Sequence, residues 1–415
     1  MAETIALDEA LQRVLEIPCD QTEVESVALS AALGRRLARP VATDGPWPAT
    51  DRSAMDGFAV AAGAGLEAGQ KLPVVGESLA GHPFAGPLPA GAAIRIMTGA
   101  VVPEAADAVV PVELTSGYEG DAVEFREAVR AGQNVRPCGS EAQAGQEIMQ
   151  PGQLVRAAEV GALAVLGKAR VEVHTRPRVA IVATGDEVVA VDKKPAPHQL
   201  RESNSWALQA QVEATGGVGE RLGVAADEPG PLREMLQHGL ESADVLVTIG
   251  GISKGTHDLV HGTLAELGVE KQFHGIRLKP GKPTFFGVRP AAKGGSGRDT
   301  LVFGLPGNPA SCFTVFDLLV RPMLHRLQGA RPAVWETQAR LAGAPWRKNP
   351  REQAIPARIE SVDTGLVATL TPFGPSGNPF GLLPANGYVL LPPMTEPDEV
   401  VAARVLTYGN GVELA

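Results

Sequence analysis

The sequence predicts a multidomain protein of the α/β plus β class, with a doubly wound α/β domain at its centre. Between residues 176 and 328, short apolar runs alternate with helical patterns, which is typical of a parallel sheet covered by helices. The stretches 46–141 and 329–415 show short apolar runs between glycine and proline turns, which predicts two smaller β domains. A length of 415 residues also exceeds one ordinary domain, so we expect two to four.

The N-terminal stretch is predicted to belong to a discontinuous domain. It contains an amphipathic helix over about residues 6–17, followed by the proline-rich boundary Pro40–Pro48. Residues 142–175 contain a further helix and strand. Neither stretch has a sufficient core of its own, so we expect residues 1–45 and 142–175 to form one elongated domain, with the β-rich domain 46–141 inserted between them.

The central domain, residues 176–328, is built from alternating elements. Its strands are expected over residues 178–183, 245–249 and 301–304. Its helices are expected over residues 203–215, 229–242 and 256–267. Ser203 or Ser205 would cap the first, a proline opens the second, and a glycine follows the third. A last helix begins at Pro309, with Asn308 as its N-cap.

Composition excludes several classes of protein. A formal net charge of −10 argues against a general nucleic-acid or anionic-membrane surface. The three cysteines lie far apart and form no CxxC pair, which favours reduced thiols. The N-terminus lacks the basic flank and apolar core of a signal peptide, and no apolar run has the length of a membrane span. We therefore expect a cytoplasmic protein.

Three loops follow predicted strands of the central domain, and each is rich in glycine. They are Thr184–Glu187, Gly250–Asp258 and Gly304–Asn308. Ligands of open α/β sheets bind at the carboxyl ends of strands, where glycines let backbone N–H groups approach an anion. The sequence therefore predicts a phosphate-type pocket, with contributions from Thr184, Gly185, Gly250, Gly251, Ser253, Gly255, Pro306, Gly307 and Asn308.

Charged side chains near the same sheet edge extend this prediction. Lys279 and Lys282 stand on a Lys-Pro-Gly-Lys-Pro turn, which either binds the anion or is a solvated basic turn. Carboxylates near phosphate indicate Mg²⁺, which takes only one or two protein oxygens; the candidates are Asp186, Glu187, Glu202 and Asp258. Helix capping is the alternative role for Glu187 and Asp258. His257 and His261 have the spacing of a zinc motif, but no third ligand is evident.

Seven ordered segments resemble the molybdopterin molybdenumtransferase family, to which the E-domain of gephyrin is related. They are SAMDGFAV, PLPAGAAIRIMTGAVVPEAADAVV, ATGDEV, SNS, TIGGISKGTHD, KPGKP and FGLPGNPAS, and the resemblance spans roughly residues 5–395. It implies an elongated dimerisation domain, a β-rich domain, a molybdopterin-binding α/β domain and a C-terminal β-barrel-like domain. It also implies a homodimer whose site is shared between the subunits.

The resemblance implies a reaction as well. Adenylylated molybdopterin and molybdate would be the substrates, AMP would be released with Mg²⁺ present, and molybdenum would be inserted at the dithiolene. The implied catalytic residues are Asp56, Thr98, Glu141, Glu187, Glu202, Asp258, Lys279 and Lys282, and Ser203 and Asn204 join the substrate-binding set. Asp186, Glu187 and Asp258 would hold the metal ion. Molybdopterin adenylyltransferase and molybdoenzymes or their chaperones are the expected partners.

Four features depart from the family pattern. Glu141 and Glu202 replace aspartates, Gly275 stands where some members have lysine, and the motif at residues 374–381 is short. They motivate an alternative function, in which a paralogue binds or carries the pterin without hydrolysing the adenylate, or prefers tungstate. Nucleotidyl transfer to a related substrate is a third hypothesis, since the α/β domain alone resembles the adenylylating enzyme of this pathway.

Overall fold

The computed structural model describes residues 4–63, 65–226, 228–251, 259–291, 298–331, 337–343, 346–363, 365–371, 374–395, 402–407 and 413–414. The chain divides into two compact units. Unit 1 comprises Met1–Arg39, Pro151–Gly161 and Ala169–Ala415, and unit 2 comprises Pro40–Gln150 and Ala162–Lys168. The finer domain boundaries drawn from the sequence stay a prediction. Among the residues described, no helix is both long and apolar enough to cross a membrane.

A six-stranded sheet forms the centre of unit 1. Its strand order is β15-β12-β16-β20-β19-β17, and the first four strands run parallel while β19 is antiparallel to both of its neighbours. The bounds are β12 Arg178–Thr184, β15 Val218–Ala225, β16 Val245–Ile249, β17 Glu270–His274, β19 Phe285–Arg289 and β20 Thr300–Leu305. All five residues of β16 are buried, as its uninterrupted apolar sequence predicts.

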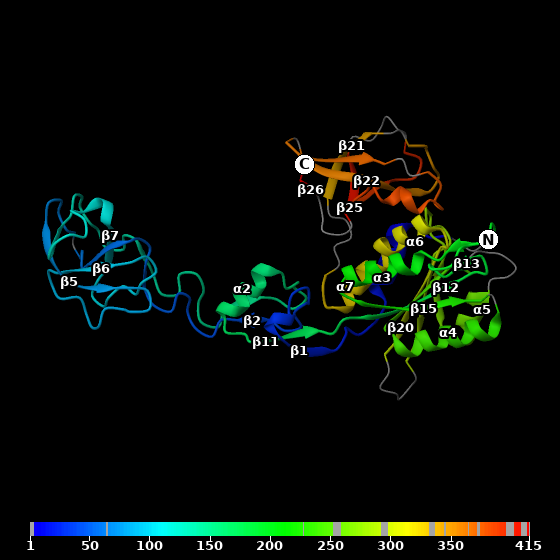
Figure 1. Ribbon diagram of the computed structural model, residues 1–415, viewed down its shortest axis with the longest axis horizontal. Coiled ribbons are helices and arrows are strands. Elements are labelled where there is room, and N and C mark those ends of the chain that lie inside the picture. The colour runs from blue at the N-terminus through cyan, green and yellow to red at the C-terminus, as the bar shows by residue number, and fades with distance from the viewer. Residues whose placement is uncertain are drawn as a thin grey trace. The chain divides into compact units, whose positions relative to one another are not determined.

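Helices cover both faces of this sheet, which confirms the doubly wound class. Alternate residues of the strands enter two separate cores, so that Ile181 packs with one set of helices and Val182 with the other. The helices are α1 Leu7–Glu16, α3 Asn204–Ala214, α6 Pro309–Val315 and α7 Arg321–Leu327 on one face, and α4 Pro229–Ser242 and α5 Leu259–Glu266 on the other. Figure 1 shows α3 and α7 on one side of the strands and α4 and α5 on the other.

The strand order reverses direction between β12 and β16. From β12 the chain passes through α3 to β15 on one side, and from β15 through α4 to β16 on the other. This is a topological switch point, where the loops at the carboxyl ends of neighbouring strands diverge and leave a crevice. The loops after β12 and β16 are two of the three glycine loops predicted to bind an anion.

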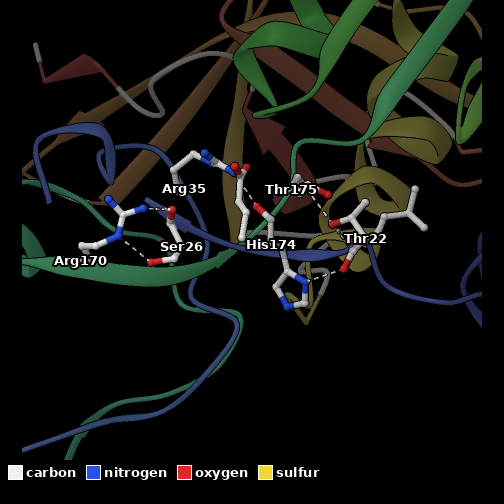
Figure 2. Close-up of polar contacts among 8 residues, drawn as sticks. Thr22, Ser26, Arg35, Arg170, His174 and Thr175 are labelled. Atoms are coloured by element: carbon white, nitrogen blue, oxygen red, sulfur yellow. Dashed lines mark hydrogen bonds and ion pairs between the residues drawn. The ribbon is translucent and has the colours of Figure 1, made fainter. Parts of the chain in front are cut away.

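Two distant stretches of unit 1 join in an antiparallel ribbon, β1 Val24–Ala28 with β11 Arg170–His174. Figure 2 shows the polar contacts that hold its base. The Thr22 hydroxyl donates to the Thr175 carbonyl at 2.7 Å, and the Arg35 guanidinium donates to the His174 carbonyl at 2.7 Å. Thr22 N also donates to the Leu327 carbonyl at 2.8 Å, so the ribbon is tied to the end of α7.

The C-terminal strands close into a small barrel. Each of five strands pairs with two others, in the cyclic order β22-β23-β21-β25-β24 and back to β22. Their bounds are β21 Thr337–Gly343, β22 Glu352–Val362, β23 Gly365–Leu370, β24 Gly387–Leu391 and β25 Ala402–Thr407. Two short strands join β22: β26 Glu413–Leu414 and β18 Leu278–Lys279.

Unit 2 is β-rich, as its short apolar runs predict. A five-stranded sheet has the order β7-β4-β6-β5-β8. Its strands are β4 Gly57–Val60, β5 Lys71–Ser78, β6 Ala93–Ile96, β7 Ala108–Pro111 and β8 Ala122–Glu124. Shorter pairs join β3 Arg52–Ser53 to β9 Val135–Arg136 and β2 Val41–Ala42 to β10 Glu147–Met149. The helix α2 Ala157–Val165 lies across the division between the units.

Most of the predicted elements exist, and several of their ends differ. Pro229–Ser242 and Val245–Ile249 have the predicted bounds, whereas β12 and β20 each extend beyond the predicted strand. The predicted side-chain caps of α3 and α6 are wrong: neither Ser203 nor Asn308 makes a capping hydrogen bond with its side chain. The predicted start of α5 at residue 256 lies outside the described residues.

Candidate functional site

The three glycine loops meet at the carboxyl edge of the central sheet. Strands β12, β16 and β20 are parallel neighbours, so the residues that follow them emerge on the same edge. The Gly250 N–H donates to the Leu305 carbonyl at 3.0 Å, which joins the second loop to the third. The Thr184 hydroxyl donates to the Ile249 carbonyl at 3.1 Å, which joins the first loop to the second.

Gly250 is required by the close approach of these loops. Its φ of +80° lies in the left-handed region, and a Cβ there would lie 3.1 Å from the Thr184 carbonyl oxygen. A Cβ on Gly307 would lie 3.7 Å from the Gly250 Cα, an ordinary contact. The backbone is therefore packed tightly at Gly250 and less tightly at Gly307.

A pocket of about 580 Å³ opens over these loops. It is lined by Glu187 and Glu202 and by residues that the sequence predicted for substrate binding, namely Ser203, Asn204, Gly250, Gly251, Pro306, Gly307 and Asn308. Thr184 is buried beneath the loops. Ser253, Gly255 and Asp258 lie outside the described residues, so their predicted roles stay predictions.

Asp186 and Glu187 are the exposed carboxylates of the first loop. Gly185 has a φ of +128°, and a Cβ there would overlap the Glu187 carboxylate, so that side chain folds back over its own loop. Among the residues described, no group of three or more His, Cys, Asp or Glu has the geometry of a metal site. Two carboxylates still suit Mg²⁺, which takes one or two from protein and completes its shell with water and phosphate oxygens.

Glu202 is held by the helix that follows it. Its carboxylate accepts from the Ser205 N–H at 2.8 Å and from the Ser205 hydroxyl at 2.5 Å, and the residue is 7% exposed. This arrangement satisfies donors in the first turn of α3, the role that we predicted for a serine. The Asn204 amide donates to the Gly307 carbonyl at 2.8 Å, so α3 is tied to the third loop.

A second pocket, of about 640 Å³, lies next to the first and shares Pro283 and Asn308 with it. Its cationic lining comes from Lys279, Lys282, Arg347 and Arg351, and no carboxylate is among the described residues that line it. The two lysines were predicted from the sequence, and the two arginines were not. Pairing of Lys279 with Gln353 through β18 and β22 places the arginines here.

The C-terminal motif reaches the site through Ser376. The Asn308 amide donates to the Ser376 hydroxyl at 3.1 Å, and Ala310 N–H donates to the Ser376 carbonyl at 3.2 Å. This contact explains why the Asn308 side chain does not cap α6. Ser376 lines the cationic pocket, although the sequence distinguished its segment only as a departure from the family pattern.

Three predicted residues belong to unit 2. The exposed Asp56 carboxylate accepts from the Thr98 N–H at 2.6 Å and from its hydroxyl at 2.8 Å. These two hydrogen bonds hold the pKa of Asp56 below its usual value. Glu141 forms an ion pair with Arg136. Within unit 2, Asp56 and Thr98 are in direct contact, and the predicted role of Glu141 stays a prediction.

Comparison with protein families gives two matches. Residues 5–167 match the model described as the MoeA N-terminal region (domain I and II). Residues 180–326 match the model described as "Probable molybdopterin binding domain". The second match contains all three glycine loops and the Lys279–Pro283 turn, and the first contains Asp56, Thr98 and Glu141.

Relatives and solved structures cover most of the chain. The molybdopterin molybdenumtransferase of Bacillus subtilis is 32% identical over 99% of this chain and 96% of its own length. That of a Nostoc species is 36% identical over 76% of this chain and 72% of its own. A crystal structure of a molybdopterin biosynthesis MoeA protein from Pyrococcus horikoshii OT3 covers 97% of this chain and 100% of its own, with a TM-score of 0.82 and 27% identity.

Proposed function

Because the chain belongs to the molybdopterin molybdenumtransferase family, we propose that it transfers molybdenum from molybdate to adenylylated molybdopterin and releases AMP. The observation that supports this most directly is the pairing of two adjoining pockets of different chemistry. One is formed by glycine loops and carboxylates, and the other is lined by four cations. The reaction has two substrates, one with a phosphoanhydride and one an oxyanion, so it needs two neighbouring sites.

The glycine-loop pocket suits the phosphates of the adenylylated substrate. Backbone N–H groups at the carboxyl ends of β12, β16 and β20 would donate to phosphate oxygens, and Arg201, which also lines this pocket, adds a positive charge. Asp186 and Glu187 would hold Mg²⁺ there, with Asp258 as the family motif implies. When bound, that ion would neutralise charge on the phosphate oxygens.

The cationic pocket suits molybdate, a dianion that is the second substrate. Lys279 and Lys282 are point charges, while Arg351 and Arg347 offer planar forks of N–H donors. No carboxylate is among the described residues that line the pocket, so none competes with molybdate for these cations. These side chains would bind the oxyanion beside the dithiolene while the neighbouring loops hold the pyrophosphate. Cleavage of the phosphoanhydride consumes one water and gives AMP and the molybdopterin phosphate. As the two dithiolene sulfurs bind molybdenum, one oxo group of molybdate leaves as water with the two thiol protons.

We further propose a cytoplasmic homodimer whose partner subunit supplies Asp56 and Thr98. The family resemblance carries this proposal, and α2 supports it. Most of its exposed residues are small or apolar, and Val165 is 55% exposed. Molybdopterin adenylyltransferase would deliver the substrate, and molybdoenzymes or their chaperones would receive the product.

A defined assay tests the transferase proposal. Purified protein, adenylylated molybdopterin, Mg²⁺ and molybdate are mixed, and released AMP and inserted metal are both counted. We expect molybdate-dependent AMP release with insertion of the metal. A Lys282→Gln variant should lose most of this activity, while Lys348→Gln, exposed and outside the pocket lining, should keep it.

The same assay separates the other hypotheses. Tight binding of the adenylylated pterin without AMP release would show a carrier and would end the transferase proposal. Faster metal insertion with tungstate than with molybdate would show that tungstate is the preferred substrate. If neither binding nor release occurs, the pockets serve a different substrate.

A further inference from the structure

Two imidazoles meet at the carboxyl edge of the central sheet, outside both pockets. His261 Nε2 and His274 Nε2 are 3.1 Å apart, and the rings make an edge contact with centroids separated by 4.1 Å. The Phe285 ring packs against His261 at 4.7 Å between centroids. His274 ends β17, which runs parallel to β20, so the pair lies on the same edge as the glycine loops.

The pair can form a hydrogen bond only if one ring nitrogen donates and the other accepts. Burial lowers the pKa of His261 to about 4, with further contributions from His274 and Lys271. A neutral His261 therefore has a lone pair available at neutral pH. The bond joins the first turn of α5 to the end of β17, two elements that adjoin different parts of the site.

The first turn of α5 also touches a glycine loop. A Cβ on Gly251 would lie 2.5 Å from Val260 Cγ2, so this glycine packs directly against the residue that precedes His261. Gly251 lines the phosphate pocket. At the other end, His274 is followed by Gly275, whose N–H donates to the Thr284 carbonyl at 2.7 Å, just beyond the Lys279–Pro283 turn.

We propose that His261 and His274 are positioning residues, whose mutual hydrogen bond fixes α5 against β17 and so sets where the Gly250–Gly251 loop meets the substrate's phosphates. The inference deepens the proposed function and rests on it for the identity of the ligand. Neither imidazole lines the pockets, so both act through Val260 and Gly251.

Binding of AMP, measured by calorimetry, tests this without requiring turnover, and inorganic pyrophosphate serves as a second probe. We expect His274→Phe and His261→Phe each to weaken AMP binding about fivefold, the scale of one hydrogen bond. The double variant should be no weaker than either single one, because both remove the same bond. His274→Gln restores a donor and acceptor near Nε2 and should stay within about twofold of wild type.

His238→Phe provides the matched control, since this exposed histidine lies on α4, away from the pockets. It should bind AMP as the wild type does. Unchanged AMP affinity in folded single variants would overturn the proposal, even if their melting temperatures fall, and so would additive losses in the double variant. If His274→Phe does not fold, His261→Phe and His274→Gln decide the matter. A wild type that binds neither probe overturns it too, whereas binding with no turnover overturns only the transferase function.

Discussion

The carboxylate of Asp56 accepts two hydrogen bonds from a single residue, Thr98, through its backbone N–H at 2.6 Å and its hydroxyl at 2.8 Å. The two residues belong to sequence segments 42 positions apart and come together at one end of the unit 2 sheet. Both hydrogen bonds favour the ionised carboxylate, so the pKa of Asp56 lies below its usual value. An exposed aspartate is thereby kept charged and fixed in direction.

Thr98→Val removes the hydroxyl and keeps the backbone donor. The pKa of Asp56 should therefore rise toward its ordinary value, and a carboxyl NMR titration measures it. The pKa of Asp56 is lower in the folded state than in the unfolded state. Its ionisation therefore stabilises the fold above the unfolded-state pKa, and this stabilisation is lost as pH falls through the folded-state pKa. The wild type should thus exceed Thr98→Val in stability at neutral pH, and the difference should shrink in acid. An Asp56 pKa that stays unchanged in the variant would contradict this.

Asp56→Asn tests the proposed catalytic use of the charge. We expect AMP release to fall at least about 100-fold, the lower range for a positioned acid–base or charged group, while the fold is kept. Asp121→Asn, an exposed aspartate of the same unit, is the control and should be neutral. Full turnover by Asp56→Asn would remove Asp56 from the proposed site.

Glu202→Gln distinguishes helix capping from catalysis. The Ser205 N–H keeps a neutral acceptor in this variant, so we expect a loss of about 1 kcal/mol in stability, measured by denaturant unfolding. Ser205→Ala removes one of the same hydrogen bonds and should cost a similar amount. If Glu202 is only a cap, the two variants lose activity equally. A much larger loss of activity in Glu202→Gln would support the predicted catalytic role.

Gly250→Ala and Gly307→Ala form a matched pair. Alanine at 250 combines a φ of +80° with a Cβ 3.1 Å from the Thr184 carbonyl oxygen, so we expect a loss of about 1–3 kcal/mol in stability. Alanine at 307 meets only an ordinary contact of 3.7 Å and should cost little. Thermal unfolding of the two variants measures the difference. Equal effects would show that the loop relaxes around the new methyl group.

Asp317 is a carboxyl group buried in the core of unit 1, beside Arg321 at 3.8 Å. Burial raises its pKa to about 6, and Arg321 opposes the shift. The pKa of Asp317 is higher in the folded state than in the unfolded state. The contribution of its protonated form to stability is therefore complete below the unfolded-state pKa, and it is lost progressively as pH rises from that value through about 6. Asp317→Asn should therefore raise the melting temperature at pH 8 and change it little at about pH 3, below the unfolded pKa. A lower melting temperature at pH 8 would show that the ion pair outweighs burial.

Elements fixed by neighbouring residues were predicted well. Val245–Ile249 is apolar throughout and forms the central strand with the predicted bounds, and Pro229 opens α4 as its fixed φ requires. Caps were predicted less well, because a polar side chain near a helix start has competing partners. The Asn308 side chain donates to Ser376, 68 residues away, instead of capping α6. The first turn of α3 is capped by Glu202 and not by a serine.

The sequence by itself determined the chemistry at the sheet edge. Glycine loops that follow apolar strands must gather there, because parallel strands place their carboxyl ends together. The seven ordered motifs likewise identified the family from residues alone. The glycine loops and the motifs are runs of neighbouring residues, so they can be identified from the sequence alone.

Only the tertiary structure decided how the cationic pocket is assembled. Lys279 lies opposite Gln353 because β18 joins the barrel strand β22, and this brings Arg347 and Arg351 to the two lysines. The pairing of β18 with β22 joins residues more than 70 positions apart, and the local sequence of neither segment predicts which strand it pairs with. It is set by packing of the barrel against the α/β core, where Ala354 and Leu390 enter the same cluster as Leu278. Burial of apolar surface drives that packing, and it specifies which segments meet only once the whole chain has folded.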